Sequence, residues 1–127
     1  MNTGLEFAHG KVHSVHNNIE AKTLDFTPHK TFAGVALKHL VRGAETENRV
    51  SCHLVKVEPG CCLNNHVHAD NLEIHEVVSG SGTFEIGTNT GAYDVGSVGV
   101  IPMGIPHKVI AGPDGLFILA TFSPALL

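Results

Sequence analysis

Four residues of the chain have the types and the spacing of ligands to a transition-metal ion: His66, His68, Glu73 and His107. Side chains two residues apart on an extended segment point the same way, so His66 and His68 address one point together. The polar tract 69–72 allows a bend that brings Glu73 to that point, and turn residues precede His107 in a second segment. Imidazoles with one carboxylate suit iron, manganese, nickel, cobalt, copper or zinc, whereas magnesium and calcium prefer oxygen ligands. The pattern predicts one divalent metal ion with an open position for water or substrate.

Two other carboxylates compete for the fourth ligand position. Asp70 lies in the bend before Glu73, where an aspartate also caps turns. Glu76 lies three residues beyond Glu73 and so faces the opposite side of a strand. Glu73 is therefore the preferred ligand.

His75 lies two residues beyond Glu73 and shares its face, so it is expected to point into the same cavity. One interpretation is a packed histidine that is hydrogen-bonded to the backbone. The alternative is a residue that supports a metal ligand or exchanges a proton with a substrate near neutral pH. We take His75 as the candidate catalytic residue.

The other histidines and the cysteines receive structural interpretations. His53 alternates with Val55 and Val57, which predicts a core position. The histidines without a supporting carboxylate pattern are expected to be surface or structural residues: His9, His13, His16, His29 and His39. The cysteines are too few and too close for a disulfide framework, and no activating base accompanies them: Cys52, Cys61 and Cys62.

The segments around the predicted ligands resemble the two motifs of the cupin superfamily. The first motif, Gly-x5-His-x-His-x4-Glu-x6-Gly, is matched by the following residues: Gly60, His66, His68, Glu73 and Gly80. The second, Gly-x5-Pro-x-Gly-x2-His-x3-Asn, is matched by the following residues, with alanine in place of asparagine at the end: Gly96, Pro102, Gly104, His107 and Ala111. That asparagine is not a metal ligand in the family pattern. The resemblance implies an all-β fold, the cupin-type double-stranded β-helix or jelly-roll barrel, with a metal inside the barrel.

Composition agrees with many short strands in one domain. The chain has 127 residues, 14 glycines and 6 prolines, and glycine interrupts its apolar runs. Strands are predicted at 33–41, 50–57, 74–79, 83–86, 98–101, 107–111 and 116–122. Turns are predicted at 42–43, 58–60, 81–82 and 113–115. The side chains expected to face the interior are those of Val55, Val57, Val77, Val109, Phe117 and Leu119.

The chain is expected to divide into an arm and a barrel. Residues 1–31 predict an irregular N-terminal arm that packs on the barrel or on a partner subunit, with a first strand near 23–26 that ends before Pro28. Residues 32–127 predict a single cupin β-barrel domain. Because such barrels commonly pair, the resemblance implies a homodimer.

Charge and hydropathy exclude other classes of partner. The net charge is −4 and the basic residues are scattered singly, so no nucleic-acid surface is expected. No apolar run approaches a membrane span or a signal peptide, which predicts a soluble cytoplasmic protein with no membrane partner.

The expected function is that of a metal-dependent enzyme acting on a small oxygen-rich, carbonyl or carboxylate compound. Dioxygenase-like chemistry is slightly favoured over isomerase, lyase or hydrolase chemistry, because the family uses this ligand set for both kinds of reaction. The alternative is a small-ligand binding or sensing module without turnover.

Overall fold

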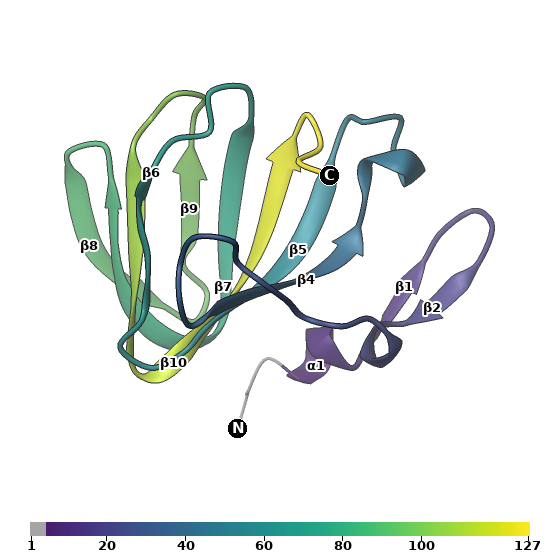
Figure 1. The fold of residues 1–127 in the computed structure, drawn as a ribbon, viewed down its shortest axis with the longest axis horizontal. Coiled ribbons are helices and arrows are strands. Elements are labelled where there is room, and N and C mark those ends of the chain that lie inside the picture. Colours follow the sequence, from purple (N-terminus) through teal and green to yellow (C-terminus); the bar gives the residue numbers. More distant parts are fainter. Residues whose placement is uncertain (1–4) are drawn as a thin grey trace.

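The computed structural model describes residues 5–127, which form an all-β jelly roll with a short N-terminal helix and hairpin at one end (Figure 1). In chain order the elements are α1 (Leu5–Ala8), β1 (Lys11–His13), β2 (Asn18–Glu20), the 3-10 helix η1 (Ala21–Thr23), β3 (Thr27–Pro28), β4 (Val35–Val41), the 3-10 helix η2 (Gly43–Glu45), β5 (Ser51–Val57), β6 (Cys62–His66), β7 (Leu72–Ile86), β8 (Asn89–Asp94), β9 (Val98–Ile101) and β10 (His107–Ser123). No helix within 5–127 is long and apolar enough to cross a membrane.

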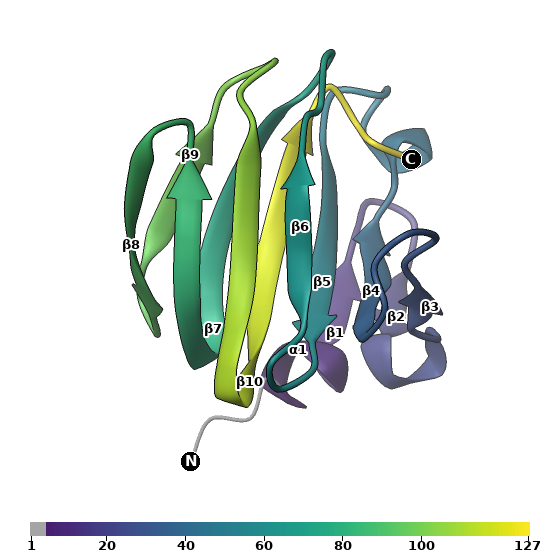
Figure 2. The same ribbon diagram turned by 60° about the vertical axis from the view of Figure 1, so that its left-hand side comes forward.

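Two long antiparallel strands, β7 and β10, hold the fold together. The strand order is β3-β4-β5-β10-β7-β8, with β6 paired to β10 and β9 paired to β7. The first part of β10 lies between β6 and the second part of β7, which continues to β8. The second part of β10 lies between β5 and the first part of β7, which pairs with β9. Both strands therefore contribute to two facing layers that enclose the interior (Figure 2).

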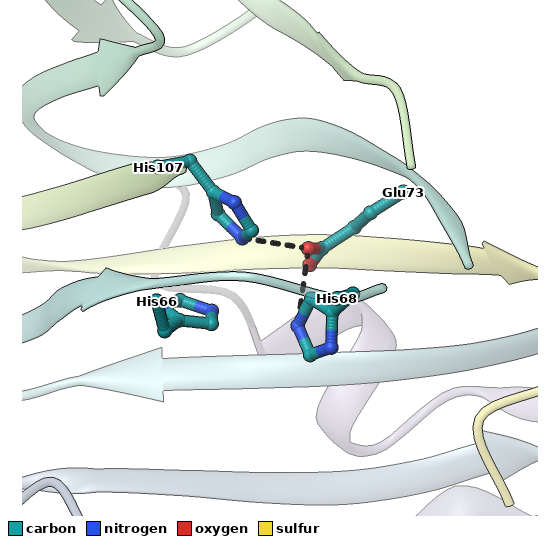
Figure 3. A group of neighbouring side chains, drawn as sticks. All are labelled: His66, His68, Glu73 and His107. Atoms are coloured by element: carbon teal, nitrogen blue, oxygen red, sulfur yellow. Dashed lines mark ion pairs between the residues drawn. The ribbon is translucent and has the colours of Figure 1, made fainter. Parts of the chain in front are cut away.

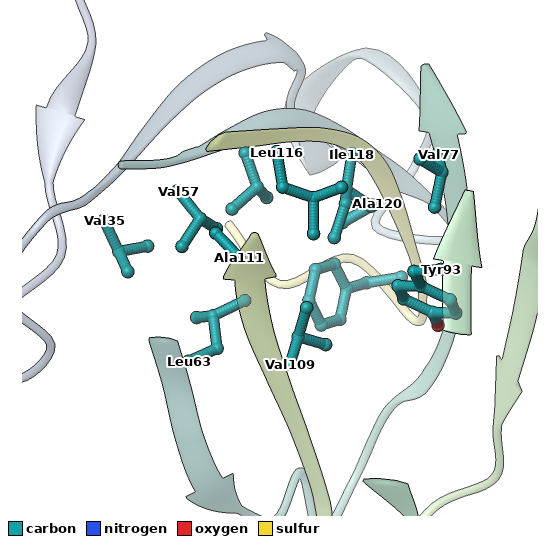
Figure 4. Close-up of a cluster of buried hydrophobic side chains, with 12 residues drawn as sticks. Val35, Val57, Leu63, Val77, Tyr93, Val109, Ala111, Leu116, Ile118 and Ala120 are labelled. Atoms are coloured by element: carbon teal, nitrogen blue, oxygen red, sulfur yellow. The ribbon is translucent and has the colours of Figure 1, made fainter. Parts of the chain in front are cut away.

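A hydrophobic core fills the space between the layers (Figure 4). The expected inward positions Val55, Val57, Val77 and Val109 are confirmed, since all four are buried there. The prediction for residues 117 and 119 was wrong. They pack in a second cluster on the other side of the sheet, while the alternate residues 116, 118, 120 and 122 face the core. The pairing register shifts between Ala111 and Leu116, so the residues that face the core change from odd to even positions. Because apolar side chains occupy both faces of the strand, the sequence did not reveal this change.

Two predicted turns are absent because the long strands pass through them. Ser81 and Gly82 lie inside β7, where glycine permits close approach: a side chain at Gly82 would meet the carbonyl oxygen of Ile110 at 2.2 Å. Residues 113–115 lie inside β10 at the register shift, so the turn signal marks an irregularity within one strand. The sequence also missed β8, because only Tyr93 of this strand is buried and the apolar pattern is weak.

The N-terminal segment is more regular than expected. It contains α1, the β1–β2 hairpin and η1, and the strand predicted near 23–26 instead begins at Thr27 and includes Pro28. Proline is tolerated because β3 lies at the edge of the sheet. Ala8 and Ala21 are buried against the barrel, and the buried ammonium of Lys38 donates hydrogen bonds to both of their carbonyl oxygens, at 2.7 and 2.9 Å. The segment thus packs on the barrel of its own chain. Residues 1–4 of the arm lie outside the described part.

Candidate metal centre

The four predicted ligands come from neighbouring strand ends and converge on one point (Figure 3). His66 is the last residue of β6 and pairs directly with His107, the first residue of β10. Glu73 is the second residue of β7. His68 lies in the connection between β6 and β7, where its carbonyl oxygen accepts a hydrogen bond from the backbone of Gly104 at 3.0 Å. This bond ties the loop of the first motif to the turn of the second.

Distances within this cluster suit a bound metal ion. One potential ligand atom from each of the four side chains lies within 4.8 Å of all the others. Glu73 Oε1 is 3.1 Å from His107 Nε2 and 3.6 Å from His68 Nε2. The rings of His66 and His107 are 4.1 Å apart, and those of His66 and His68 are 5.0 Å apart. A first-row metal ion placed among these atoms can reach all four at bonding distance with small side-chain shifts.

Two buried polar atoms of the cluster have no hydrogen-bond partner among the described residues, namely Glu73 Oε1 and His107 Nε2. Their 3.1 Å separation is short, yet the geometry does not make a hydrogen bond between them. A buried polar atom without a hydrogen-bond partner lowers the stability of the folded protein, so such a pair indicates that a ligand binds between the two atoms. A metal ion would satisfy both atoms, and the site therefore fits the cofactor that its donor set implies.

Backbone carbonyls fix the ring orientation of two of the histidines. His66 Nδ1 donates to Asn64 O at 2.7 Å, and His107 Nδ1 donates to Ile105 O at 3.0 Å. With the proton held on Nδ1, the Nε2 atom of each neutral ring keeps a free lone pair. Metal-binding histidines commonly use such a bond to hold the ring and its tautomer. The arrangement prepares both rings to act as Nε2 ligands.

Electrostatics favour the metal-binding forms of three of the four side chains, those of His66, His68 and Glu73. Burial lowers the pKa of His66 to about 4, against the opposing hydrogen bond to Asn64, and burial lowers the pKa of His68 as well. Burial would raise the pKa of Glu73, but contacts with His107 and His75 outweigh it and hold the pKa well below its usual range. Burial would lower the pKa of His107, but Glu73 and the backbone carbonyl of Ile105 outweigh it and raise that pKa. Metal binding at His107 therefore releases a proton. The carboxylate is thus ionised, and the two partly exposed imidazoles are neutral.

Several solved structures with similar architecture are described as cupins. An RmlC-like cupin from Shewanella frigidimarina superposes with a TM-score of 0.75 at 18% identity, covering 89% of this chain and 94% of that one. The chain has the cupin fold. A predicted oxalate decarboxylase from Thermotoga maritima gives a TM-score of 0.72 at 20% identity, covering 84% and 97%. The polyketide cyclase RemF from Streptomyces resistomycificus gives 0.73 at 18% identity, covering 87% and 80%. No protein-family model matches the sequence, and neither does any curated protein.

His75 is buried beside the candidate metal-binding cluster and contacts one of the predicted ligands directly. Its Nε2 lies 2.8 Å from Glu73 Oε2, and its Nδ1 lies 3.0 Å from the hydroxyl of Tyr93. A carboxylate only accepts hydrogen bonds, so His75 Nε2–H is the donor. Burial raises the pKa of Tyr93 to about 12, which keeps its hydroxyl protonated as a donor to Nδ1. Tyr93 and His75 thus fix Oε2 of Glu73 by hydrogen bonds and leave Oε1 free to bind a metal.

The rival carboxylates and the cysteines lie outside the cluster. Asp70 and Glu76 are both exposed, and within 5–127 the group of converging metal-binding side chains contains neither of them. All three cysteines are free thiols. Burial raises the pKa of Cys52, which opposes thiolate formation.

Several contacts around the site were missed by sequence reasoning. Phe32, from the loop before β4, packs against His66 with ring centroids 5.5 Å apart. Phe122 of β10 packs against His68 at 5.1 Å. Tyr93, the only tyrosine of the chain, supports His75 from β8. All three residues lie outside the two motifs. The one signal for Tyr93 was a single aromatic residue in an otherwise polar segment.

Proposed function

We propose that this cupin is a metal-dependent enzyme acting on a small oxygen-rich, carbonyl or carboxylate compound. The observation that carries the proposal is the pair of buried, unpartnered atoms Glu73 Oε1 and His107 Nε2 at the centre of a converging three-histidine, one-carboxylate cluster. Structural metal sites are usually closed and rich in cysteine, whereas a site with four protein ligands of this kind leaves room for a substrate atom. The donor set suits iron, manganese, nickel, cobalt, copper or zinc.

Charge at the cluster favours an anionic oxygen group of the substrate. Neutral imidazoles and one carboxylate leave a divalent centre with a net charge of about +1. When bound, the metal supplies Lewis acidity and, if it is redox-active, a centre for oxygen chemistry. Phe32 and Phe122 pack against His66 and His68 and limit the access of water, which strengthens electrostatic interactions at the cluster. His66 and His107 are held by backbone carbonyls, so the site is organised before the substrate arrives.

Dioxygenase-like chemistry is the first reaction class to test, with isomerase, lyase and hydrolase chemistry next. Among proteins with similar folds are a predicted oxalate decarboxylase and a polyketide cyclase. Decarboxylation and cyclisation both act on oxygen-rich acids or ketones. Such compounds therefore belong in the substrate panel beside catechol-like and enol substrates that suit oxygen insertion.

His75 is proposed to support catalysis through Glu73. Both of its ring nitrogens are engaged, one with Glu73 Oε2 and one with Tyr93, so its direct contact is with a ligand of the proposed metal. The prediction that it also exchanges a proton with the substrate is tested by His75→Leu. Unchanged turnover in the metal-loaded variant would eliminate that catalytic role.

We further propose a homodimer formed through an exposed sheet face. Val98 and Val100 of β9 are 61% and 57% exposed, and Leu72 of β7 is exposed on the same sheet. Burying such side chains favours association. Light scattering of the wild type and of Val100→Glu tests this, and a monomeric wild type would refute it. The free thiols agree with a reducing compartment, and we propose the cytoplasm.

The decisive test is the metal content of untagged protein by elemental analysis, for the wild type, for His66→Ala and for the exposed control His16→Ala. We expect about one metal per chain in the wild type and control and a large loss in His66→Ala. Iron, manganese, nickel, cobalt or copper would direct the screen to oxygen chemistry, and zinc to non-redox chemistry. If the wild type holds no metal and takes none up on soaking, the metalloenzyme proposal fails, and a binding or sensing module becomes the better account.

A further inference from the structure

A cavity of about 320 Å³ lies between β3, β4 and the C-terminal residues. Its lining includes His29, Lys30, Leu37, His39, Leu126 and Leu127. None of the four predicted metal ligands belongs to it. Cavities that bind small molecules usually have volumes of about 300–1,000 Å³ and few polar groups, so this one has room for a small molecule.

His29 presents a hydrogen-bond donor from this lining. Its Nδ1 accepts hydrogen bonds from the backbone amides of Thr31 and Phe32, at 3.0 and 3.2 Å. A ring nitrogen that accepts cannot carry a proton, so the proton of the neutral ring is on Nε2. Burial lowers the pKa of His29, which favours this neutral form. The described residues provide no partner for Nε2–H.

His39 presents a second donor in the following hydrogen-bond arrangement. Ser51 Oγ accepts the backbone N–H of Leu126 at 2.8 Å and lies 2.8 Å from His53 Nε2. We assign the Ser51 hydroxyl as the donor to His53 Nε2, since a hydroxyl can donate one hydrogen bond while its oxygen accepts another. The proton of neutral His53 is then on Nδ1, which donates to His39 Nδ1 at 2.7 Å, and His39 carries its own proton on Nε2. Within 5–127 this Nε2–H also has no protein partner.

Basic side chains lie at and near the cavity. Lys30 belongs to the lining, and burial followed by the positive charge of nearby Arg42 lowers the pKa of His39. A terminal oxygen of Leu127, also in the lining, accepts a hydrogen bond from the backbone N–H of Gly43. No aspartate or glutamate side chain among the described residues lines the cavity. Three leucines line the cavity beside Thr27, Pro28 and Thr31, and Leu37 and Leu126 also pack on the core. Two N–H donors, nearby basic side chains and an apolar wall suit an anion that carries an apolar group.

We propose that this cavity binds a small carboxylate with an apolar tail, whose oxygens accept hydrogen bonds from the Nε2–H groups of His29 and His39. The tail packs against Leu37, Leu126 and Leu127. A neutral alcohol of the same length would keep the apolar contacts but lose the charge, and an alkylammonium would be repelled by Lys30.

The cavity is a neighbour of the candidate metal centre but separate from it. His29 stacks on Phe32 with ring centroids 4.6 Å apart, and Phe32 contacts His66 on its other side. Binding in the cavity requires no metal, because its donors are protein N–H groups. A measurement on metal-free protein therefore tests this site alone, whatever the metal content of the wild type proves to be.

The experiment is calorimetric titration of chelator-treated full-length protein with hexanoate, hexan-1-ol and hexylammonium. We expect one hexanoate per chain, bound at least about tenfold more tightly than the alcohol, because a charged acceptor strengthens each hydrogen bond. His29→Asn and His39→Asn retain a polar atom near the position of Nδ1 and delete Nε2–H. Each is expected to weaken hexanoate about tenfold or more, whereas the exposed control His16→Asn should not.

Location is checked in the wild type by amide chemical shifts, which requires no variant to fold. Hexanoate should shift the amides of Lys30, Thr31 and Leu127. Equal affinity for hexanoate and hexan-1-ol would overturn the proposal, as would full affinity in both asparagine variants. Shifts confined to the segment 66–68 would place the ligand in the histidine cluster and would overturn it as well.

Discussion

Replacing His75 with leucine should weaken metal binding without removing any of the four predicted ligands. In the folded protein His75 Nε2–H donates to Glu73 Oε2 at 2.8 Å, and it is the only hydrogen-bond partner of that oxygen among the described residues. Leucine leaves the buried oxygen without a donor, so the carboxylate can rotate or share its oxygens differently. The residue that orients a metal ligand is thereby lost, while the ligand stays.

The size of the effect follows from burial. His75 is 1% exposed and Glu73 is 5% exposed, so water does not replace the lost hydrogen bond. Loss of a partner that orients a metal ligand typically lowers metal affinity about 10–100-fold, or about 1.4–2.7 kcal/mol. The metal-free protein should also lose about 2–4 kcal/mol of unfolding free energy, because Glu73 Oε2 and the hydroxyl of Tyr93 both lose their partner.

A second substitution separates these two effects. In the double variant His75→Leu/Tyr93→Phe the unpaired hydroxyl is removed, so about 1 kcal/mol of the unfolding free energy should return. Metal affinity should stay low, since Glu73 still lacks its donor. In His75→Gln the side-chain amide can donate from near the position of Nε2, and much of the metal affinity should be retained.

Two assays measure the outcome: competition for the metal with a chromophoric chelator, and urea unfolding of the metal-free proteins. Metal affinity in His75→Leu within about twofold of the wild type would refute the orienting role of His75. Equal loss of affinity in His75→Leu and His75→Gln would show that the ring itself, rather than its donated hydrogen bond, is what Glu73 requires.

Three further predictions concern stability. Burial lowers the pKa of His53 from 6.5 to about 4, so between these pH values the unfolded chain binds more protons than the folded one and the unfolding free energy falls as pH falls. Glutamine does not titrate, so the difference in unfolding free energy between wild type and His53→Gln, measured by urea titration, should narrow by up to about 3 kcal/mol from pH 7 to pH 4. Lys38→Met deprives two backbone carbonyls of the N-terminal segment of their donor, and should lower the unfolding free energy by about 2 kcal/mol and speed proteolysis of that segment. Gly99→Ala places a methyl 1.9 Å from the hydroxyl of Tyr93, and should lower the melting temperature and also weaken metal binding, because that hydroxyl supports His75. An unchanged melting temperature in Gly99→Ala would contradict this packing.

The local part of the site could be predicted from the sequence. His66, His68 and Glu73 lie within one short segment, and glycine and proline residues fix the turn before His107, so spacing alone indicates which side chains share a direction. The structure brings these four together as expected. Alternation also placed Glu76 on the exposed side and His75 in the interior.

The long-range part was decided by tertiary structure. Strands β7 and β10 each serve both layers, which no local turn signal reveals: the residues at 81–82 and 113–115 that predicted turns lie within these strands. A register shift in β10 places Phe117 and Leu119 on the face opposite to the expected one. The sequence could not show this, because apolar residues occupy both faces of the strand and their alternation does not tell which face is buried in the core.

Contacts between distant segments complete the site and could not be read from spacing. Tyr93 reaches His75 from β8, Phe32 reaches His66 from the loop before β4, and His39 meets His53 across two strands. Sequence patterns report which way a side chain points on its own strand, since that depends on the local backbone. Which partner it meets depends on the packing of strands far apart in the chain, and only the folded structure determines that.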